Sequence, residues 1–561
     1  MPSLRPPHTR SFLFLSLMLE LHASIGAQSL PDAGIIRQQI EQQRELPLPH
    51  AVRPTHPTPP PEIKPKTGMT VTVKHFRFAG NTLLGSEQLA AAVVDFLNRP
   101  LNFSELQRAA DAVAVAYREA GWIVRVYLPE QDIKEGTVTL QVVEARFGGL
   151  RFEGEPSQRL MASEIEAYFT AQQAQGQPLN AKALDRALLL ADDLPGVSVA
   201  GTLAPGQADG ETALVLQTTD EPFIYGDIGV DNTGARSTGS DRLMANLNIN
   251  SAGGRGELIS LNVLHTQGSD YSRIAMTVPD GYNGLRLGVN ASSMSYQVID
   301  GPGYNSAAQI KGSSGSKGIE SSYPLLRDRL QNLYFTTGLE NKTFYTRDTQ
   351  VRSDYESDSL RLGLSGNQFD DWGGGGANSG SLQMVWGNLT SMQAHTQKDT
   401  IDRQYHKLSY SLSRQQNLSP AHSLYVSLTG QHATQVLDSS EKFYIGGANS
   451  VRAYPVSELG GERGQVLSGE WRWRLDNSIV LTAFADVGRV VSLPATSSDN
   501  TTALLLRGTG LSVGWQAPMG ISTKLTWSHR SGSNPKPTST GTDGDGTLHK
   551  NRIWYTASVG F

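Results

Sequence analysis

From residue 222 to the C-terminus, apolar and polar residues alternate in stretches of about ten, separated by turns rich in Gly, Asn, Asp and Ser. Residues 465–475 place two leucines and two tryptophans on one face and Glu470 and Arg472 on the other. A period of two is the spacing of a β-strand with two unlike faces. The pattern therefore predicts a long series of strands, each with one apolar and one charged side.

Residues 479–490 and 521–530 follow the same rule, with Asp486 and Lys524 on the polar faces. Such faces, repeated over about 340 residues, are typical of a transmembrane β-barrel, which meets lipid outside and water inside. We count about sixteen strands, an even number as in bacterial barrels, although the boundaries between residues 297 and 328 stay open. A soluble β-sandwich or β-helix is the alternative, because its apolar face would cover a core.

The last predicted strand runs to the final residue. Phe561 shares one face with every second residue back to Ile553, and the other face begins with Arg552. Soluble proteins usually fray at their ends, whereas this strand resembles the C-terminal signal of bacterial outer-membrane barrels. The resemblance implies that Phe561 is an assembly signal and that the barrel-assembly machinery is a partner during biogenesis.

Two similar α/β units precede the barrel and form an internal repeat of about 75 residues. The first unit is predicted to span residues 68–144, and the second residues 145–220. In the first unit we expect strands near 71–78, 123–128 and 138–143, and helices at 89–97 and 103–120. In the second unit we expect strands at 147–152, 197–203 and 212–218, and helices at 162–173 and 181–192.

Residues 1–27 have the pattern of a secretory signal peptide. Arg5 and Arg10 precede a short apolar run, and Ile25 and Ala27 suit cleavage after the latter. The apolar run is too short to span a bilayer. An N-terminal anchor helix is therefore the weaker alternative.

Residues 28–46 contain a polar helical pattern with a thin apolar stripe, and Asp32 is placed to cap its start. So thin a stripe suits a wet, polar cavity better than a core. A disordered tail is the alternative. Residues 47–67 form a Pro-rich linker, and in a polyproline II conformation it would reach roughly 60 Å. The helix can therefore dock far from the domain that follows.

Composition narrows the classes of partner and chemistry. The formal net charge of −5 gives no reason to expect a nucleic-acid partner. The chain has no cysteine, which excludes disulfides, thiol catalysis and Cys-based zinc sites. It also lacks a P-loop, a GxSxG elbow, an HExxH motif and clustered histidines. We therefore expect no catalytic residue, no metal site, no cofactor and no enzymatic activity.

Five motifs together resemble one family. YREAGWIVRVYLPEQDIKEGTVTLQVVE (117–144) resembles the first POTRA domain of two-partner-secretion transporters, the TpsB group known as the ShlB/FhaC/HecB family of haemolysin secretion/activation proteins. ALDRALLLADDLPGVSVAGTLAPG (183–206) resembles the second POTRA domain, and DNTGARSTG (231–239) the start of the barrel. FYIGGANSVRAYP (443–455) and FADVG (484–488) match barrel motifs of the superfamily that includes BamA-type insertases.

The resemblance implies a mainly β fold: a sixteen-stranded barrel over residues 221–561, two POTRA domains and an N-terminal plug helix. It implies that the VRAYP loop folds into the lumen, where Arg452 pairs with Asp486. The alternation independently places Asp486 on the lumen face. In a wet lumen the pair would contribute only about 1 kcal/mol, so its expected role is to position the loop; a solvated Arg452 is the alternative. The other expected motif residues are Gly446, Gly447, Val451 and Tyr454 in the loop, and Phe484 and Gly488 in the strand.

A small sheet with a free edge beside a helix can bind an unfolded protein as an added strand. The resemblance makes the strand at 122–128 and the helix at 104–120 the candidate groove. Fold maintenance is the alternative, since Gly121 and Gly136 can supply turns and Leu128–Pro129 can end a strand. The candidate groove residues are Tyr117, Gly121, Trp122, Leu128, Pro129 and Gln131.

The resemblance implies a transporter in the bacterial outer membrane, surrounded by its lipid, with the POTRA domains in the periplasm. It would bind a large unfolded exoprotein that carries an N-terminal secretion domain and translocate it without ATP. An outer-membrane insertase is the alternative, although insertases usually carry more POTRA domains and lack the plug and linker. A passive porin or an enzyme displayed on a barrel fits less well. The sequence does not distinguish a haemolysin, an adhesin, a contact-dependent toxin or a haem-binding protein as the client.

Overall fold

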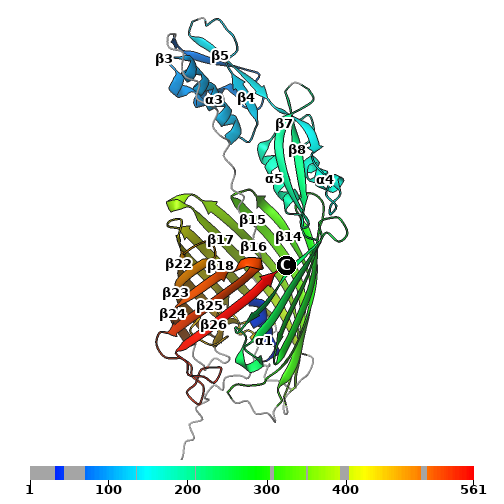
Figure 1. The fold of residues 1–561 in the computed structure, drawn as a ribbon, viewed down its shortest axis with the longest axis vertical. Helices are drawn as coiled ribbons and strands as arrows, with labels where there is room; N and C mark the ends of the chain where they lie inside the picture. The colour runs from blue at the N-terminus through cyan, green and yellow to red at the C-terminus, as the bar shows by residue number, and fades with distance from the viewer. Residues whose placement is uncertain are drawn as a thin grey trace, which may run out of the picture.

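The computed structural model describes residues 32–42, 70–133, 135–208, 210–302, 309–348, 352–391, 404–493 and 502–561. The expected signal peptide and Pro-rich linker lie outside these residues. Two small α/β domains are stacked at one end of a barrel, and a short helix lies inside the barrel (Figure 1). None of the helices in the described ranges is long and apolar enough to cross a membrane.

Sixteen strands of the described chain form a closed antiparallel barrel, in which β26 pairs with β9. This confirms the predicted strand number. The region that the pattern left open contains the end of β13 and all of β14. The bounds are β9 (Ile224–Asp231), β10 (Arg242–Asn250), β11 (Leu258–Thr266), β12 (Ser269–Pro279), β13 (Arg286–Gln297), β14 (Lys311–Arg327), β15 (Gln331–Arg347), β16 (Arg352–Asp370), β17 (Gly376–Ser391), β18 (Gln404–Asn417), β19 (His422–Ala433), β22 (Arg463–Arg474), β23 (Ile479–Ser492), β24 (Thr502–Gln516), β25 (Ile521–Arg530) and β26 (Asn551–Gly560).

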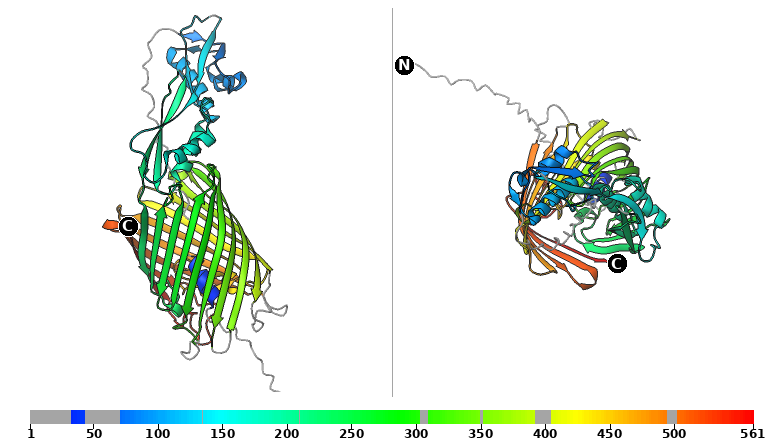
Figure 2. Two further views of the ribbon diagram at one scale, coloured as in Figure 1. Left: turned by 90° about the vertical axis from the view of Figure 1, so that its right-hand side faces the viewer. Right: turned by 90° about the horizontal axis from the view of Figure 1, so that it is seen from above.

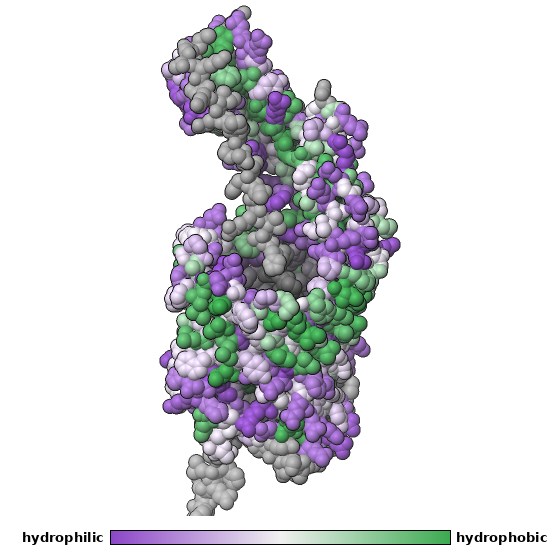
Figure 3. All heavy atoms as spheres, viewed as in Figure 1, coloured by the Kyte–Doolittle hydropathy of each residue, from purple (hydrophilic) through white to green (hydrophobic). Residues whose placement is uncertain are grey.

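The two faces of the barrel wall differ as the alternation predicts. On β26, Ile553 is 60% exposed on the outer face, whereas Trp554 is 8% exposed on the inner face. On the face of the barrel seen in Figure 3, apolar side chains gather in a band across the outer wall, with polar residues beyond it. The last residue closes the ring, because Phe561 and Gly226 exchange two backbone hydrogen bonds of 3.0 Å. Short 3₁₀ helices lie between strands: η2 (Arg236–Thr238), η3 (Trp372–Gly374), η5 (Ser439–Glu441) and η6 (Pro518–Gly520).

The first α/β domain has a three-stranded sheet in the order β2-β5-β4, covered by helices. The predicted first strand is divided in two, and the first helix begins and ends earlier than expected. Asn102 caps α3 by accepting from the N–H of Glu105 at 2.9 Å, and Glu105 returns the contact. The bounds are β1 (Val71–Thr72), β2 (His75–Ala79), α2 (Ser86–Ala92), η1 (Val94–Phe96), β3 (Pro100–Leu101), α3 (Phe103–Glu119), β4 (Val124–Tyr127) and β5 (Thr137–Glu144).

The second α/β domain repeats this plan, which confirms the internal repeat. Its sheet has the order β6-β8-β7, with β6 and β8 parallel and β7 antiparallel to β8. Phe147, Phe169 and Leu216 lie in its buried core. The bounds are β6 (Arg146–Phe152), α4 (Ala162–Gln172), α5 (Ala181–Asp192), β7 (Val197–Pro205) and β8 (Glu211–Asp220).

The second domain is fixed to the barrel by ion pairs. Arg327 of β14 binds both carboxylate oxygens of Asp193 at 2.7 and 2.8 Å, and Arg329 contacts Asp185 at 2.8 Å. Arg186 donates to the carbonyl oxygen of Pro324 at 3.0 Å. Contacts along α5 with the end of β14 and the turn after it fix the orientation of the domain over the barrel opening.

The helix α1 (Ala33–Gln42) lies in the barrel lumen. Figure 2 shows the inclined strands enclosing it. Asp32 caps it as predicted, by accepting from the N–H of Ile35 at 2.9 Å. The surrounding is polar only in part, because Ala33 and Ile36 are buried in an apolar cluster on the inner wall that includes Tyr296, Phe344, Tyr355 and Tyr405.

Candidate functional site in the barrel lumen

A hairpin between β19 and β22 folds into the lumen. Its strands β20 (Phe443–Ile445) and β21 (Leu459–Gly461) pair with each other outside the barrel ladder. We call residues 446–458 between them the lumen loop. The loop lies against the inner wall in an apolar cluster, which explains why it holds one position. The cluster comprises Phe443, Ile445, Val451, Ala453, Tyr454 and Leu459 from the hairpin, and Val466, Val490 and Leu506 from the wall.

Glycines permit this close packing. Gly446 and Gly447 begin the loop with φ angles of 106° and 102°, a region that L side chains rarely adopt. On the wall, a Cβ added to Gly488 would lie 2.7 Å from Cγ2 of Val451. The glycine of the FADVG motif is therefore needed because the loop presses directly on β23.

Arg452 joins the tip of the loop to two wall strands. Its Nε and Nη2 donate to the two oxygens of Asp486 at 2.8 and 2.7 Å, and its backbone N–H donates to the same carboxylate at 3.1 Å. Its Nη1 also donates to Glu470 at 2.8 Å. The guanidinium carbon lies 3.5 Å from the ring centre of Phe484. The pairing expected from the motifs is thus present in the bidentate geometry that suits arginine better than lysine.

The surroundings of this pair differ from the expectation. The Arg452 side chain is 7% exposed and that of Asp486 is 0% exposed, so the pair is buried and the figure of about 1 kcal/mol, which applies to a solvated pair, does not describe it. Removing one partner of a buried pair costs about 3–5 kcal/mol, because the other charge is left without compensation. The carbonyl oxygen of Arg452 also accepts from Ser528 and from Trp554 Nε1, both at 2.7 Å. One loop residue therefore contacts four strands of the wall.

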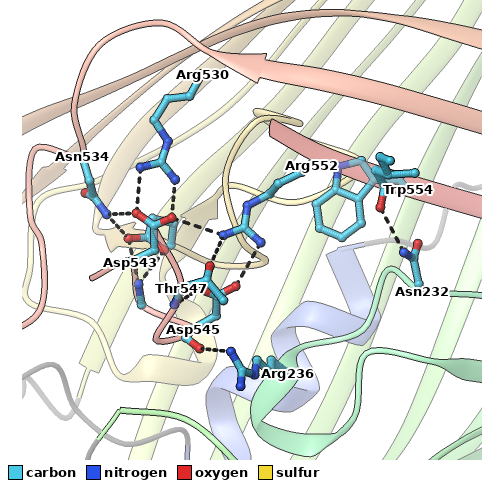
Figure 4. A network of polar contacts seen from close by, with 12 residues as sticks. Asn232, Arg236, Arg530, Asn534, Asp543, Asp545, Thr547, Arg552 and Trp554 are labelled. Carbon is cyan, nitrogen blue, oxygen red and sulfur yellow. Dashed lines mark hydrogen bonds and ion pairs between the residues drawn. The ribbon is translucent and has the colours of Figure 1, made fainter. Parts of the chain in front are cut away.

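A second loop covers the first at the end of the barrel far from the α/β domains. Figure 4 shows Arg530 and Arg552 converging on Asp543 in the loop of residues 531–550. Asn534 donates to Asp543 at 2.9 Å and also contacts Glu458 of the lumen loop. The backbone N–H of Gly544 donates to Glu458 at 2.9 Å. The two loops are thereby fastened to each other.

Charged residues also connect α1 to the segment that leads into the hairpin. Arg37 is 2% exposed, pairs with Glu41 at 2.6 Å and donates to Ser292 at 3.1 Å. Ser439 of η5 donates to both carboxylate oxygens of Asp32, at 2.8 and 2.7 Å. Lys342 lies 3.7 Å from Glu41 and 3.3 Å from Glu441, so one wall cation contacts both pieces.

The candidate groove residues are divided between the core and the domain junction. Tyr117 is fully buried and donates to Glu144 at 2.9 Å, so it cannot line a surface groove. Gly121 accepts from the N–H of Ala181, and Trp122 bridges to Asn180 of the second domain. These three residues support the domain and its junction, and the assignment of Tyr117 to an open groove was wrong because the residue is fully buried.

The remaining groove candidates lie beside β4. Gln131 binds the backbone of Thr139 through both ends of its amide, at 2.7 and 2.8 Å, whereas Leu128 and Pro129 are half-buried. In the described structure β4 pairs only with β5, so its other edge is open beyond the junction. Burial acts to raise the pKa of Glu144, but hydrogen bonds from Thr82, Leu83 and Tyr117 hold that pKa below its usual range.

Sequence reasoning missed several partners of the site. The sequence pattern placed Glu470 on the polar face of its strand. A carboxylate on that face is a possible partner for Arg452, so this contact could have been predicted. Trp554 carries no such signal, because its contact with the loop depends on barrel closure. The same holds for Lys342 and Glu441, which meet across the lumen.

Comparison with known proteins identifies the family. The model of the haemolysin secretion/activation proteins ShlB/FhaC/HecB matches residues 210–517, and that of the ShlB-type POTRA domain matches residues 71–145. The chain belongs to the ShlB/FhaC/HecB family. Members of this family are two-partner-secretion transporters of the outer membrane, so the POTRA domains lie in the periplasm and the loop of residues 531–550 at the cell surface.

Several relatives can be aligned with most of this chain. The heme/hemopexin transporter protein HuxB of Haemophilus influenzae is 25% identical and aligns over 86% of this chain and 88% of its own length. The outer membrane transporter CdiB of Escherichia coli is 26% identical over 84% and 82%. A solved structure of CdiB from Escherichia coli has a TM-score of 0.70 at 21% identity, covering 95% of this chain and all of that one. BamA from Haemophilus ducreyi shares the fold, with a TM-score of 0.53 at 13% identity and coverage of 88% and 100%.

Proposed function

We propose that this two-partner-secretion transporter binds an unfolded exoprotein through its POTRA domains and passes it through the lumen to the cell surface. The proposal rests mainly on what fills the lumen. Two separate segments, α1 and the lumen loop, occupy it, and side-chain contacts hold them to the wall. Either piece can move without opening the backbone ladder of the wall. A pore closed by such pieces suits a large client that passes intermittently.

No step of the proposed transport is enzymatic, and no ATP is required. The periplasm holds no ATP, so we propose that folding of the client outside the cell biases its passage outward. During biogenesis the proposed partner is the barrel-assembly machinery, with Phe561 as the signal it reads. The relatives include a heme/hemopexin transporter protein, a hemolysin transporter protein and the outer membrane transporter CdiB.

The test is to find the client beside the gene. A large neighbouring reading frame with an N-terminal secretion domain should encode a protein that reaches the cell surface only when this transporter is present. Surface immunoblots of cells with and without the transporter gene measure this. Insertion defects of unrelated outer-membrane proteins on deletion, with normal export of that neighbour, would favour the insertase alternative.

The free edge of β4 gives a prediction about client capture. We expect Val126→Pro to weaken binding of the chemically unfolded secretion domain of that neighbour, because proline removes a backbone donor from a strand edge. Binding to the purified full-length transporter is measured by surface plasmon resonance. Leu203→Pro on β7, the open edge of the second POTRA domain, is the matched control. Loss of binding with Leu203→Pro alone would contradict the choice of β4.

A further inference from the structure

Two arginines stand on the outer wall toward the cell-surface ends of their strands. Arg489 of β23 and Arg507 of β24 are exposed. Arg489 is opposite Leu505 and Arg507 is opposite Val487, so all four lie on the lipid-facing side. The two arginines are diagonal neighbours, for which Cα atoms lie roughly 7–8 Å apart. Two long guanidinium side chains at this separation can reach one group between them.

The position of the pair along the barrel axis places it in the outer leaflet. At the periplasmic ends of the same region, Trp471, Trp473 and Trp515 are exposed on the outer wall, and tryptophans mark membrane interfaces. Arg507 is eight residues from Trp515 on β24. At about 3.3 Å per residue and a tilt of about 40°, this is roughly 20 Å along the axis, close to the height of the apolar band of such barrels. The arginines therefore lie at the opposite, outer interface.

The charge of the pair is not balanced by the protein. Within the described residues, neither arginine has an ion-pair partner, and no Asp or Glu faces outward on β22, β23, β24 or β25. Arg463 of β22, opposite Val491, is a third outward cation near the same level, but its Nε donates to the carbonyl oxygen of Ala433 at 2.9 Å. By contrast, outward-facing Arg352 on β16 pairs with Asp354 at 3.4 Å. The wall at β22–β24 thus presents uncompensated guanidinium groups to the outer leaflet.

We propose that Arg489 and Arg507 form a binding site for the phosphate groups of lipid A in the outer leaflet. Guanidinium groups bind phosphate in a bidentate manner. The apolar outer side chains below them, such as Val487 and Leu511, provide a surface for the acyl chains. The partner is a phosphorylated glycolipid, whose headgroup lies at the level of the arginines while its chains lie along the band.

The test uses the full-length transporter, purified in detergent and stripped of lipid, with diphosphoryl lipid A as the probe. Native mass spectrometry measures the bound fraction across a lipid A titration. We expect R489Q/R507Q to bind about tenfold more weakly than wild type, since charge-assisted hydrogen bonds are lost. R352Q removes the same kind of charge from a compensated site and should bind like wild type.

Two results would overturn the proposal. The first is equal binding of lipid A by wild type and R489Q/R507Q, with both proteins shown to be folded by the heat-induced shift of the barrel on gels. The second is equally tight binding of phosphatidylglycerol with the same loss in the variant, which would reduce the site to a general anion surface. R489K/R507K keeps the charge and is expected to fall between wild type and the glutamine variant.

Discussion

Replacing Arg452 with alanine is expected to leave the barrel assembled and to reduce export of the client by about tenfold or more. The substitution leaves Asp486 buried without its cation, at a cost of about 3–5 kcal/mol to the docked loop. It also removes the contacts to Glu470 and Phe484. A cost of this size is enough to shift a two-state equilibrium of the loop from docked to undocked. The sixteen-strand ladder contains none of the lost bonds, so the wall should form.

Export is measured by immunoblots of client in culture medium and on cells, with assembly checked by the heat-induced gel shift. Arg472→Ala is the matched control. Like Arg452, Arg472 pairs with Glu470 in the lumen, at 2.7 Å, but it belongs to β22 and not to the loop. Arg452→Lys is expected to restore only part of export, because lysine cannot grip both oxygens of Asp486. Full export by Arg452→Ala, with an assembled barrel, would refute a positioning role for the arginine.

Deleting residues 32–42 is expected to raise the ion conductance of single barrels in planar bilayers several-fold. The helix fills part of the lumen beside the cluster around Tyr355 and Phe344. A sixteen-stranded barrel without it is wide enough for an aqueous channel. Single-channel recordings of the purified protein measure the change. Conductance equal to that of the full chain would show that α1 does not plug the pore.

A point variant tests whether α1 must be held in its observed position, and not only be present, to close the pore. A Cβ on Gly34 would lie 2.6 Å from Oγ of Ser439, so Gly34→Val should push the helix from η5 and raise conductance as the deletion does. Gln42→Val, at the exposed end of the same helix, should leave conductance low. If both variants behave alike, the contact with η5 does not hold the plug.

The alternation predicted the barrel and its two faces because lipid and water impose opposite demands on neighbouring residues of one strand. It placed Asp486 and Glu470 inside, and the motif resemblance supplied Arg452 as a partner. The contact with Trp554 could not be predicted from the pattern, since it joins the loop to a strand 102 residues away in the sequence. The pairing of charges across a lumen depends on how the barrel closes and on the stagger between its strands. The residue pattern of one strand does not show either.

The helix in the lumen shows a second limit. Its thin stripe suggested a polar cavity, but Ala33 and Ile36 pack on Tyr296, Phe344 and Tyr355, which come from three different strands. On its own lumen face each of these aromatics has mostly polar neighbours, and Met294 beside Tyr296 on β13 is the other apolar residue of these strands that joins the cluster. Only closure of the wall gathers them into a cluster. The contacts of Gly121 and Trp122 with the second domain could not be predicted for a related reason, because they are not visible in either repeat alone.

The most direct measurement of the central claim is cross-linking of a client arrested during export. The chain has no cysteine, so single cysteines report one position each. Thr429→Cys on β19 faces the lumen and is exposed there, whereas Val426→Cys faces lipid on the same strand. A client carrying cysteines, stalled by a folded C-terminal fusion, should form a disulfide with residue 429 and none with residue 426. Cross-links at residue 426, or none at residue 429 while the client is stalled, would contradict passage through the barrel.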